Sequence, residues 1–277
     1  MSVIINNLKD FSIEQIFDCG QCFRFDPDAD GWISGIAYNK KISFRQTGDT
    51  LYIDNITADE YETTWKYFLS LDVDYSAVKR EIIARFGNTP MINAAVNYGY
   101  GIRILRQEPW EMVCSFIISA NNNIPRIKRI VSDMARLYGA PIDGGHAFPT
   151  PETLYNVGVD KLADLKMGWR AKYIIDAAER MLDGRLNLDE IAQCDTLTAM
   201  QKLQEVKGIG PKVAACIALM GLNKTDAFPI DVWIKRALDK YFPDGLDIAE
   251  LGEYAGIANQ YLFYYERYTR GREDARF

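Results

Sequence analysis

The sequence predicts an α+β protein, with an antiparallel β-sheet domain at the N-terminus and a larger helical domain after it. Two patterns support this prediction. Apolar and polar residues alternate through much of the first 55 or so residues, and a helical spacing of apolar residues takes over from about residue 59. We expect the sheet domain, with flanking helices, to span 1–98 and the helical domain to span 99–277.

Three alternating segments make up the predicted sheet: ISGIAYN at 33–39, KISFRQ at 41–46 and TLYIDNI at 50–56. The last two are separated by TGD at 47–49, a short connection that contains glycine. Such a connection between two alternating segments is typical of a β-hairpin.

The helical part begins with ADEYETTWKYFLSL at 58–71 and DYSAVKREIIARF at 74–86. Proline fits the first turn of a helix because no amide donor is needed there. Four later helix starts are marked in this way, at Pro109, Pro125, Pro151 and Pro211. The segment GGHAFPTP at 144–151 is the clearest loop, and residues 109–277 are otherwise expected to be almost wholly helical.

The composition is that of a soluble globular protein, with 277 residues, of which 48% are hydrophobic and 25% charged. No apolar run reaches the roughly 18 to 20 residues that a membrane span needs. The N-terminus lacks the basic and apolar regions of a signal peptide. We therefore expect a cytoplasmic protein with no membrane partner, and we expect a monomer.

The five cysteines predict buried, reduced thiols, because most of them lie within apolar or helical patterns. Cys19 and Cys22 have the spacing of a metal-binding pair, but there is no second pair and His146 is the only histidine. The C-terminus also lacks the four-cysteine cluster of an iron–sulfur centre. We expect no metal held by side chains and no cofactor, although backbone carbonyls near 205–210 could hold a cation.

The net charge of −6 and the pI near 5.0 argue against a protein that is basic over its whole surface. The charge is unevenly distributed, however. Residues 1–100 carry 9 Lys/Arg against 14 Asp/Glu, whereas residues 202–240 carry 7 against 4. A nucleic-acid contact needs local positive potential only, so the C-terminal part remains a candidate.

A helix-hairpin-helix motif is predicted at about 203–222, with its turn at Gly208-Ile209-Gly210 and its second helix opening at Pro211. Glycine suits this turn because it tolerates positive φ and lets another backbone approach closely. The amides around Gly208, Gly210 and the new helix start lack partners, which makes them a seat for a phosphate group.

Lys212 stands at the second position of this helix, and Asp231 lies near the start of the next one. The positive helix end disfavours the protonated form of Lys212, and a neutral lysine is a nucleophile that can form a Schiff base. Each residue also has an ordinary interpretation, Lys212 as an exposed surface lysine and Asp231 as a helix N-cap. The segment alone leaves a DNA-repair glycosylase and a non-catalytic DNA-binding module open.

Three further residues could form a flat pocket beside Lys212. Cys216 lies four positions after it on the same helical face, and Phe263 could form the opposite wall. Asn259 lies four positions before Phe263 and could donate hydrogen bonds to whatever lies between them. The ordinary interpretation is a core cysteine for Cys216 and a core aromatic for Phe263.

Seven motifs together resemble the 8-oxoguanine DNA glycosylases of the helix-hairpin-helix superfamily. They are CGQCFRF at 19–25, GIRILRQEPWE at 101–111, SFIISANNNIPRI at 115–127, GWRAKY at 168–173, GIGPKVAACIALMGL at 208–222, PIDVW at 229–233 and AGIANQYLF at 255–263. The resemblance runs nearly end to end and in the same order. It implies base-excision repair of duplex DNA that contains oxidised guanine, with the damaged nucleotide flipped out of the helix.

The resemblance also implies roles for individual residues. Lys212 would attack the sugar C1′ and form an imine, Asp231 would stabilise positive charge on the sugar, and β-elimination would then nick the strand. The Gly20 carbonyl would accept the N7–H that distinguishes 8-oxoguanine from guanine, while Cys216 and Phe263 would sandwich the base. Without the resemblance, Gly20 would be an ordinary turn glycine.

Four residues match those that the family uses at the opposite strand. Asn121, Arg126 and Arg170 would read the estranged cytosine, and Trp169 would wedge into the gap in the duplex. The ordinary interpretations are helix caps and solvent exposure for the first three, and a core or interface tryptophan for the last.

Two positions depart from the eukaryotic members of the family. Trp233 stands in place of a histidine that contacts phosphate, and an indole N–H can donate one hydrogen bond but cannot become cationic. Asn259 stands in place of a glutamine that grips the base, and the neighbouring Gln260 is rotated by about 100° around the helix.

Two alternatives remain beside a bifunctional 8-oxoguanine glycosylase and AP lyase. A monofunctional alkylated-base glycosylase of the same superfamily would use the aspartate with water and would lack the hairpin lysine, so Lys212 argues against it. A non-catalytic helix-hairpin-helix module would not require both Lys212 and Asp231.

Overall fold

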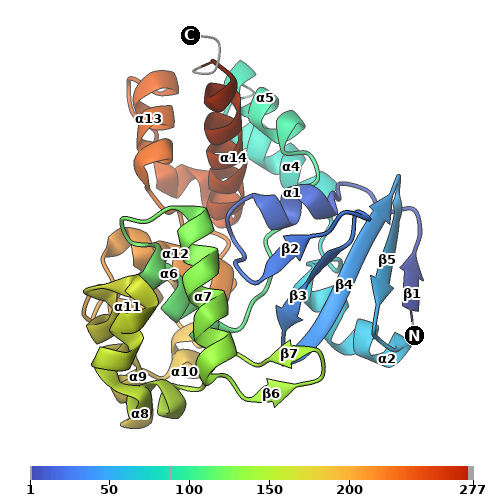
Figure 1. The fold of residues 1–277 in the computed structure, drawn as a ribbon. Helices are drawn as coiled ribbons and strands as arrows, with labels where there is room; N and C mark the ends of the chain where they lie inside the picture. Colours follow the sequence, from blue (N-terminus) through green and yellow to red (C-terminus); the bar gives the residue numbers. More distant parts are fainter. Residues whose placement is uncertain (1, 88, 274–277) are drawn as a thin grey trace.

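The computed structural model describes residues 2–87 and 89–273, which form a five-stranded antiparallel sheet and a larger assembly of helices (Figure 1). The predicted α+β architecture is confirmed. Both the predicted order, sheet first and helices after, and the helical character of the C-terminal part are found.

The strand order in the sheet is β1-β5-β4-β3-β2, and all neighbouring strands are antiparallel. The bounds are Ser2–Ile5 for β1, Phe25–Pro27 for β2, Ile33–Ala37 for β3, Lys40–Thr47 for β4 and Thr50–Asp54 for β5. Thr47 pairs with Thr50, so the predicted hairpin is confirmed with a loop of Gly48 and Asp49. The sequence patterns missed β1 and β2, and also helix α1, Ile13–Asp18.

An aromatic core lies under the sheet. The rings of Phe17 and Phe25 stack with centroids 4.5 Å apart, and Phe44 and Phe68 pack beside them. Phe68 ends a helical stretch that consists of α2, Ala58–Glu60, a π-helical turn, Tyr61–Trp65, and α3, Lys66–Phe68. A capping box between Thr57 and Glu60 starts this stretch, which explains why the helix begins there.

The helical part surrounds two buried helices, α6, Pro109–Ser119, and α12, Pro211–Gly221, which pack against each other. The helices around them are α4, Tyr75–Arg85; α5, Pro90–Tyr98; α7, Ile124–Tyr138; α8, Pro151–Leu162; α9, Arg170–Leu182; α10, Leu188–Gln193; α11, Thr196–Leu203; α13, Val232–Tyr241; and α14, Ala255–Glu273. The four helix starts predicted from proline are confirmed, with each proline in a first turn. None of the helices in the described part of the chain is both long enough and apolar enough to cross a membrane.

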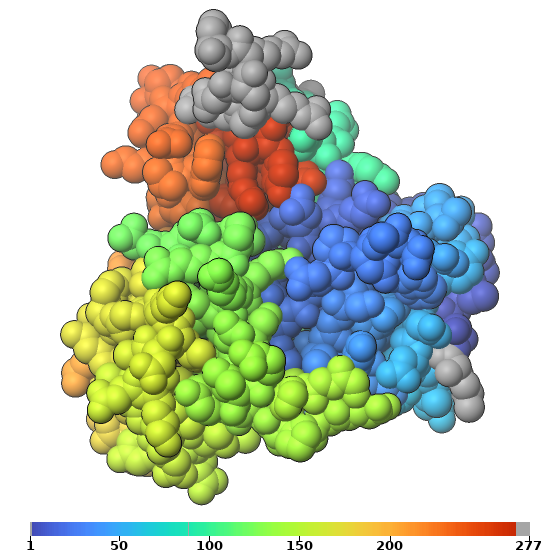
Figure 2. Space-filling model, in the orientation of Figure 1, coloured from blue at the N-terminus to red at the C-terminus, as the bar shows by residue number. Residues whose placement is uncertain are grey.

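One predicted loop is partly a β-hairpin. Gly145 and His146 form strand β7, which pairs with β6, Pro141–Ile142. This hairpin packs against the sheet. Gly145 lies so close to β3 that a Cβ at this position would be 2.5 Å from the Ile36 side chain. Figure 2 shows the yellow-green segment lying against the blue sheet region along the lower edge of the molecule.

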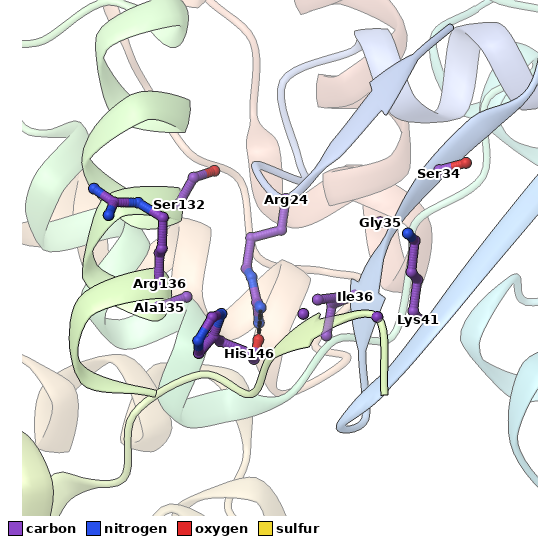
Figure 3. Close-up of a pocket in the computed structure, with 11 residues that line it drawn as sticks. Arg24, Ser34, Gly35, Ile36, Lys41, Ser132, Ala135, Arg136 and His146 are labelled. Carbon is purple, nitrogen blue, oxygen red and sulfur yellow. Dashed lines mark hydrogen bonds between the residues drawn. The ribbon is translucent and has the colours of Figure 1, made fainter. Parts of the chain in front are cut away.

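A cavity of about 290 Å³, called here the junction cavity, lies where this hairpin and α7 meet the sheet. Arg24 projects into the middle of it, between α7 on one side and β3 on the other (Figure 3). Its guanidinium donates to the carboxylate of Glu111 at 3.1 Å and to the carbonyl of His146 at 2.5 Å. Both charged side chains are nine-tenths or more buried, so the pair joins the sheet region to helix α6.

Candidate active site

The residues predicted to act together line one cavity, called here the Lys212 cavity. Its volume is about 70 Å³, room for on the order of two water molecules. Among its lining residues are both predicted catalytic residues and the four predicted lesion-binding residues: Lys212, Asp231, Gly20, Cys216, Asn259 and Phe263. A wider groove of about 730 Å³, called here the outer groove, shares Gly20, Lys212 and Asp231 with this cavity as lining residues.

The hairpin that positions Lys212 is tightly built. Gly208 has φ of +86°, and a Cβ at this position would lie 2.1 Å from the ring of Tyr173 on α9. Both the backbone conformation and the close approach therefore require glycine. Gly210 is the N-cap of α12 and offers no side-chain cap, so the first amides of the helix remain available for a phosphate group.

Lys212 is the second residue of α12, as predicted, and its side chain is half-buried. Its amine lies 5.9 Å from the centre of the Phe116 ring of α6. Cys216, one turn later, is 5% exposed. Burial raises the pKa of the Cys216 thiol, Lys212 acts to lower it and Asp231 acts to raise it. The thiol is therefore neutral at physiological pH and presents a polarizable wall.

Asp231 is the N-cap of α13, and its Oδ1 accepts hydrogen bonds from the amides of Trp233 at 2.9 Å and Ile234 at 2.8 Å. The ordinary role of this residue as a helix cap is therefore confirmed. The two bonds also fix the orientation of the carboxylate, because both go to the same oxygen while the side chain lines the Lys212 cavity. None of the ion pairs among the described residues involves Lys212 or Asp231.

Gly20 comes from the N-terminal part of the chain and follows helix α1. Its φ is +80°, and a Cβ would lie 3.1 Å from Ile124 and 3.6 Å from the ring of Phe263. The position therefore favours glycine on two grounds, backbone conformation and space. The Gly20 backbone thus forms a wall of the cavity at a point that a side chain would obstruct.

Asn259 and Gln260 both line the Lys212 cavity, although they are consecutive residues of α14. The amide of Asn259 donates to the carbonyl of Pro229 at 2.9 Å, and the amide of Gln260 donates to the carbonyl of Cys19 at 2.6 Å. Both side chains are almost fully buried. Although Gln260 is rotated around the helix relative to Asn259, its side chain still lines the cavity, next to Cys19.

Three of the four residues predicted for the opposite strand, Asn121, Arg126 and Trp169, are exposed. Asn121 lines the groove with φ of +51°, and Arg126 is exposed and donates to the carbonyl of Lys166 at 2.7 Å. Trp169 is 45% exposed, with its ring 5.3 Å from that of Tyr173. An exposed tryptophan fits the predicted contact with DNA better than a core position.

Arg170 differs from its predicted neighbours because it is 5% exposed. Its guanidinium donates to the carbonyls of Ala120 at 2.5 and 3.0 Å and of Asn121 at 2.9 Å. In this structure Arg170 therefore fixes the loop that carries Asn121, and its predicted contact with cytosine stays a prediction. Trp233 lines the outer groove at the start of α13, where its ring lies 5.3 Å from the guanidinium of Arg236.

The sequence interpretation left several lining residues of the Lys212 cavity without a role there. They are Cys19, Phe116, Met220, Pro229, Ile234 and Gln260. Most lie inside or next to the motifs at 19–25, 115–127, 229–233 and 255–263, so the motifs were a usable signal. Their positions depend on helix packing, which the motifs alone do not specify.

Comparison with known families gives two matches that together cover most of the chain. Residues 3–113 match the N-terminal domain of 8-oxoguanine DNA glycosylase. Residues 114–245 match the HhH-GPD superfamily of base excision DNA repair proteins. The second match includes Lys212 and Asp231, and the first includes Gly20.

Solved structures and curated relatives agree with these matches. The structure of an 8-oxoguanine glycosylase/lyase from Clostridium acetobutylicum, in complex with double-stranded DNA containing cytosine opposite 8-oxoguanine, superposes with a TM-score of 0.89. The two proteins are 35% identical, and the match covers 97% of this chain and 96% of that one.

Two curated relatives are an N-glycosylase/DNA lyase of Saccharomyces cerevisiae, 40% identical over 152 residues, and a probable N-glycosylase/DNA lyase of Methanothermobacter thermautotrophicus, 35% identical over 200 residues. These matches cover 49% and 60% of this chain, but only 40% and 64% of the relatives. The family matches agree with the near-complete structural superposition and with the residues that line the Lys212 cavity. The chain belongs to the 8-oxoguanine DNA glycosylase family of the HhH-GPD superfamily.

Proposed function

We propose that this protein is a bifunctional DNA glycosylase and AP lyase that excises 8-oxoguanine from duplex DNA. One observation carries the proposal. The amine of Lys212 and the carboxylate of Asp231 line a single cavity with Gly20, directly behind a hairpin whose free amides suit a DNA phosphate. A nucleophile, a carboxylate and a backbone wall thus surround the space that a flipped base and its sugar would enter.

Lys212 is the proposed nucleophile. Its neutral amine attacks C1′ of the flipped nucleotide, the bond from C1′ to the base nitrogen breaks, and the base leaves with the electron pair and takes up a proton. The sugar ring then opens, with a proton moving to its oxygen, and an imine forms between Lys212 and C1′. Removal of a C2′ proton expels the 3′ phosphate, which cuts the strand by β-elimination.

Asp231 is the proposed electrostatic partner. Positive charge develops on the sugar as the bond to the base breaks, and a fixed carboxylate stabilises that charge at low reorganisation cost. The two amide hydrogen bonds to Oδ1 hold the group in place before the reaction. The other oxygen, Oδ2, is outside this cap and is the one that can face the sugar.

Recognition of the lesion is proposed to involve the Gly20 carbonyl, with Cys216 and Phe263 on the faces of the base. The neutral Cys216 thiol suits contact with a flat ring. A purine is larger than a cavity of about 70 Å³, so we expect the walls to move apart as the base enters from the outer groove. The Asn259 amide keeps one N–H and its oxygen for the base edge, because only one hydrogen bond is committed to Pro229.

The proposed test is reduction with borohydride during reaction with a duplex that contains 8-oxoguanine opposite cytosine. Reduction converts the imine into a stable covalent bond, so the wild-type protein is expected to become linked to the DNA. Lys212→Gln should give no linked product, whereas the control Lys41→Gln, which removes a lysine of the junction cavity, should give as much as wild type. A linked product from Lys212→Gln, or none from wild type, would refute the proposal.

The same experiment separates the alternatives. A monofunctional glycosylase would release the base without a trapped product, and a non-catalytic DNA-binding module would do neither. The positions of Lys212 and Asp231 on one cavity support the bifunctional enzyme over both, because a binding module has no need of a carboxylate and a lysine amine on the same cavity.

A further inference from the structure

The Gly20 wall of the Lys212 cavity is held by hydrogen bonds on both sides of the glycine. Before it, the carbonyl of Cys19 accepts the amide of Gln260 at 2.6 Å. After it, the carbonyl of Gln21 accepts the amide of Gln107 at 2.8 Å. The side chain of Gln21 is itself fixed, since it donates to the carbonyl of Arg103 at 2.8 Å. Gly20 therefore lies between two anchored peptide groups.

This arrangement matters because glycine has the widest conformational freedom of any residue. With φ of +80°, Gly20 is in a region that other residues rarely adopt, and its own carbonyl could rotate if the neighbouring peptides were free. The anchors remove that freedom. Gln260 supplies the anchor on the side of Cys19, and it does so from α14, at the far end of the sequence.

We infer that Gln260 is a positioning residue for lesion recognition, which aims the Gly20 carbonyl into the Lys212 cavity by holding the Cys19 carbonyl. It is 3% exposed, so its hydrogen bond is shielded from water. This inference rests on the proposed function, because it assumes that the Gly20 carbonyl accepts the N7–H of 8-oxoguanine. Gln260 acts through Gly20 and takes no part in the chemistry at Lys212.

The neighbouring residue strengthens the inference. Asn259 donates to the carbonyl of Pro229, two residues before Asp231. Two consecutive carboxamides of α14 thus hold two different backbone segments, one beside Gly20 and one beside Asp231. Helix α14 therefore sets the separation of the recognition wall and the catalytic wall, and the Gln260 bond is the one on the recognition wall.

The test compares two substrates with the same protein. Gln260→Met keeps the length and burial of the side chain but removes its donor. Excision of 8-oxoguanine needs the Gly20 carbonyl, whereas nicking of a preformed abasic site needs Lys212 and Asp231 but no base pocket. We expect Gln260→Met to lower the rate of 8-oxoguanine excision about tenfold, the effect of one lost hydrogen bond, and to leave abasic-site nicking within about twofold.

Two further variants sharpen the result. Gln193→Met, an exposed glutamine at the end of α10, is the control and should change neither activity. Gln260→Glu should excise 8-oxoguanine better at low pH, where a protonated carboxyl can donate to the Cys19 carbonyl, than at high pH, where it cannot. Equal losses on both substrates in Gln260→Met, or no loss on either, would overturn the inference.

Amide hydrogen exchange provides a measurement that does not depend on the substrate. Without its anchor the loop at 19–21 should open more often, so exchange there should be faster in Gln260→Met than in wild type. Unchanged exchange would overturn the inference. Failure of the proposed function is a different outcome, because then the wild-type protein itself would not excise 8-oxoguanine.

Discussion

The junction cavity and the Lys212 cavity both lie where the N-terminal part of the chain meets the helical part. They differ in whether their charged side chains form ion pairs. In the junction cavity, the buried Arg24 is paired with the carboxylate of Glu111. It also donates to the carbonyl of His146 (Figure 3). In the Lys212 cavity, Lys212 and Asp231 belong to none of the ion pairs among the described residues. A buried charge in an ion pair has a structural role, whereas an unpaired charge that faces a cavity is available to interact with a ligand.

This difference predicts that variants of the two cavities fail in different assays. Changes at Lys212 or Asp231 should remove activity and leave stability nearly unchanged. Changes in the junction cavity should lower stability and leave the activity of the folded protein unchanged.

The largest effect is expected for Asp231→Asn. Asparagine caps a helix about as well as aspartate, so the free energy of unfolding should change by less than about 0.5 kcal/mol. The carboxylate charge is lost, however, and single-turnover excision of 8-oxoguanine should fall on the order of a hundredfold to a thousandfold. Binding to the lesion duplex, measured separately, should be retained.

Asp231→Ser is the matched variant, because serine also caps a helix but carries no charge. It should be stable and as slow as Asp231→Asn. Normal turnover in either variant would mean that the carboxylate only caps α13. The proposed catalytic role of the unpaired Asp231 charge would then be wrong.

The two cavities also differ in how far they could be predicted from sequence. The hairpin, the position of Lys212 and the cap at Asp231 depend on local features, namely glycine spacing and a proline in the first turn, and these predictions were confirmed. The bond between Gln260 and Cys19 joins the two ends of the chain, and helical periodicity has no information about such a contact.

The fold shows the same division. The hairpin of β4 and β5 was predicted because both strands alternate and a short loop joins them. Strands β1 and β2 are only 4 and 3 residues long and are defined by pairing with β5 and β3, so their own sequences gave no clear pattern. Arg24 and Glu111 lie in two separate sequence motifs, at 19–25 and 101–111, and nothing in either motif predicts that the two side chains meet. Their pairing depends on packing between the sheet region and α6.

The second prediction concerns Arg24→Met, which removes one partner of the buried pair. The Glu111 carboxylate would then be buried without a counter-charge, and the free energy of unfolding should fall by roughly 3 to 5 kcal/mol at pH 8. Replacing both partners, Arg24→Met with Glu111→Leu, should recover most of this loss, because no unpaired charge remains. Urea unfolding of the three proteins provides the measurement.

Abasic-site nicking by the folded Arg24→Met protein should match wild type when it is assayed well below its melting temperature. A specific loss of nicking would show that the junction cavity contributes to the Lys212 cavity and that the two are not separate. Equal stability of the single and double variants would show that the pair has little effect on the fold.

The smallest effect is expected from pH, and it again distinguishes the two cavities. Burial raises the pKa of Glu111 from 4.5 to about 7, although Arg24 acts in the opposite direction. Between these two values the folded protein binds more protons at Glu111 than the unfolded chain does. Stability from this group is therefore greatest below about pH 4.5 and is lost as the pH rises toward 7, by on the order of 3 kcal/mol.

The unfolding free energy should be measured from pH 5 to pH 8 for wild type and for Glu111→Gln, whose amide does not titrate. The stability of wild type relative to Glu111→Gln should fall as the pH rises, because the neutral amide stands in for the protonated carboxyl, and it should level off toward pH 8. The control Glu152→Gln, which removes an exposed carboxylate at the start of α8, should run parallel to wild type. If the wild-type and Glu111→Gln curves were parallel as well, Glu111 would be fully ionised throughout this pH range. Arg24 would then lower the Glu111 pKa by as much as burial raises it.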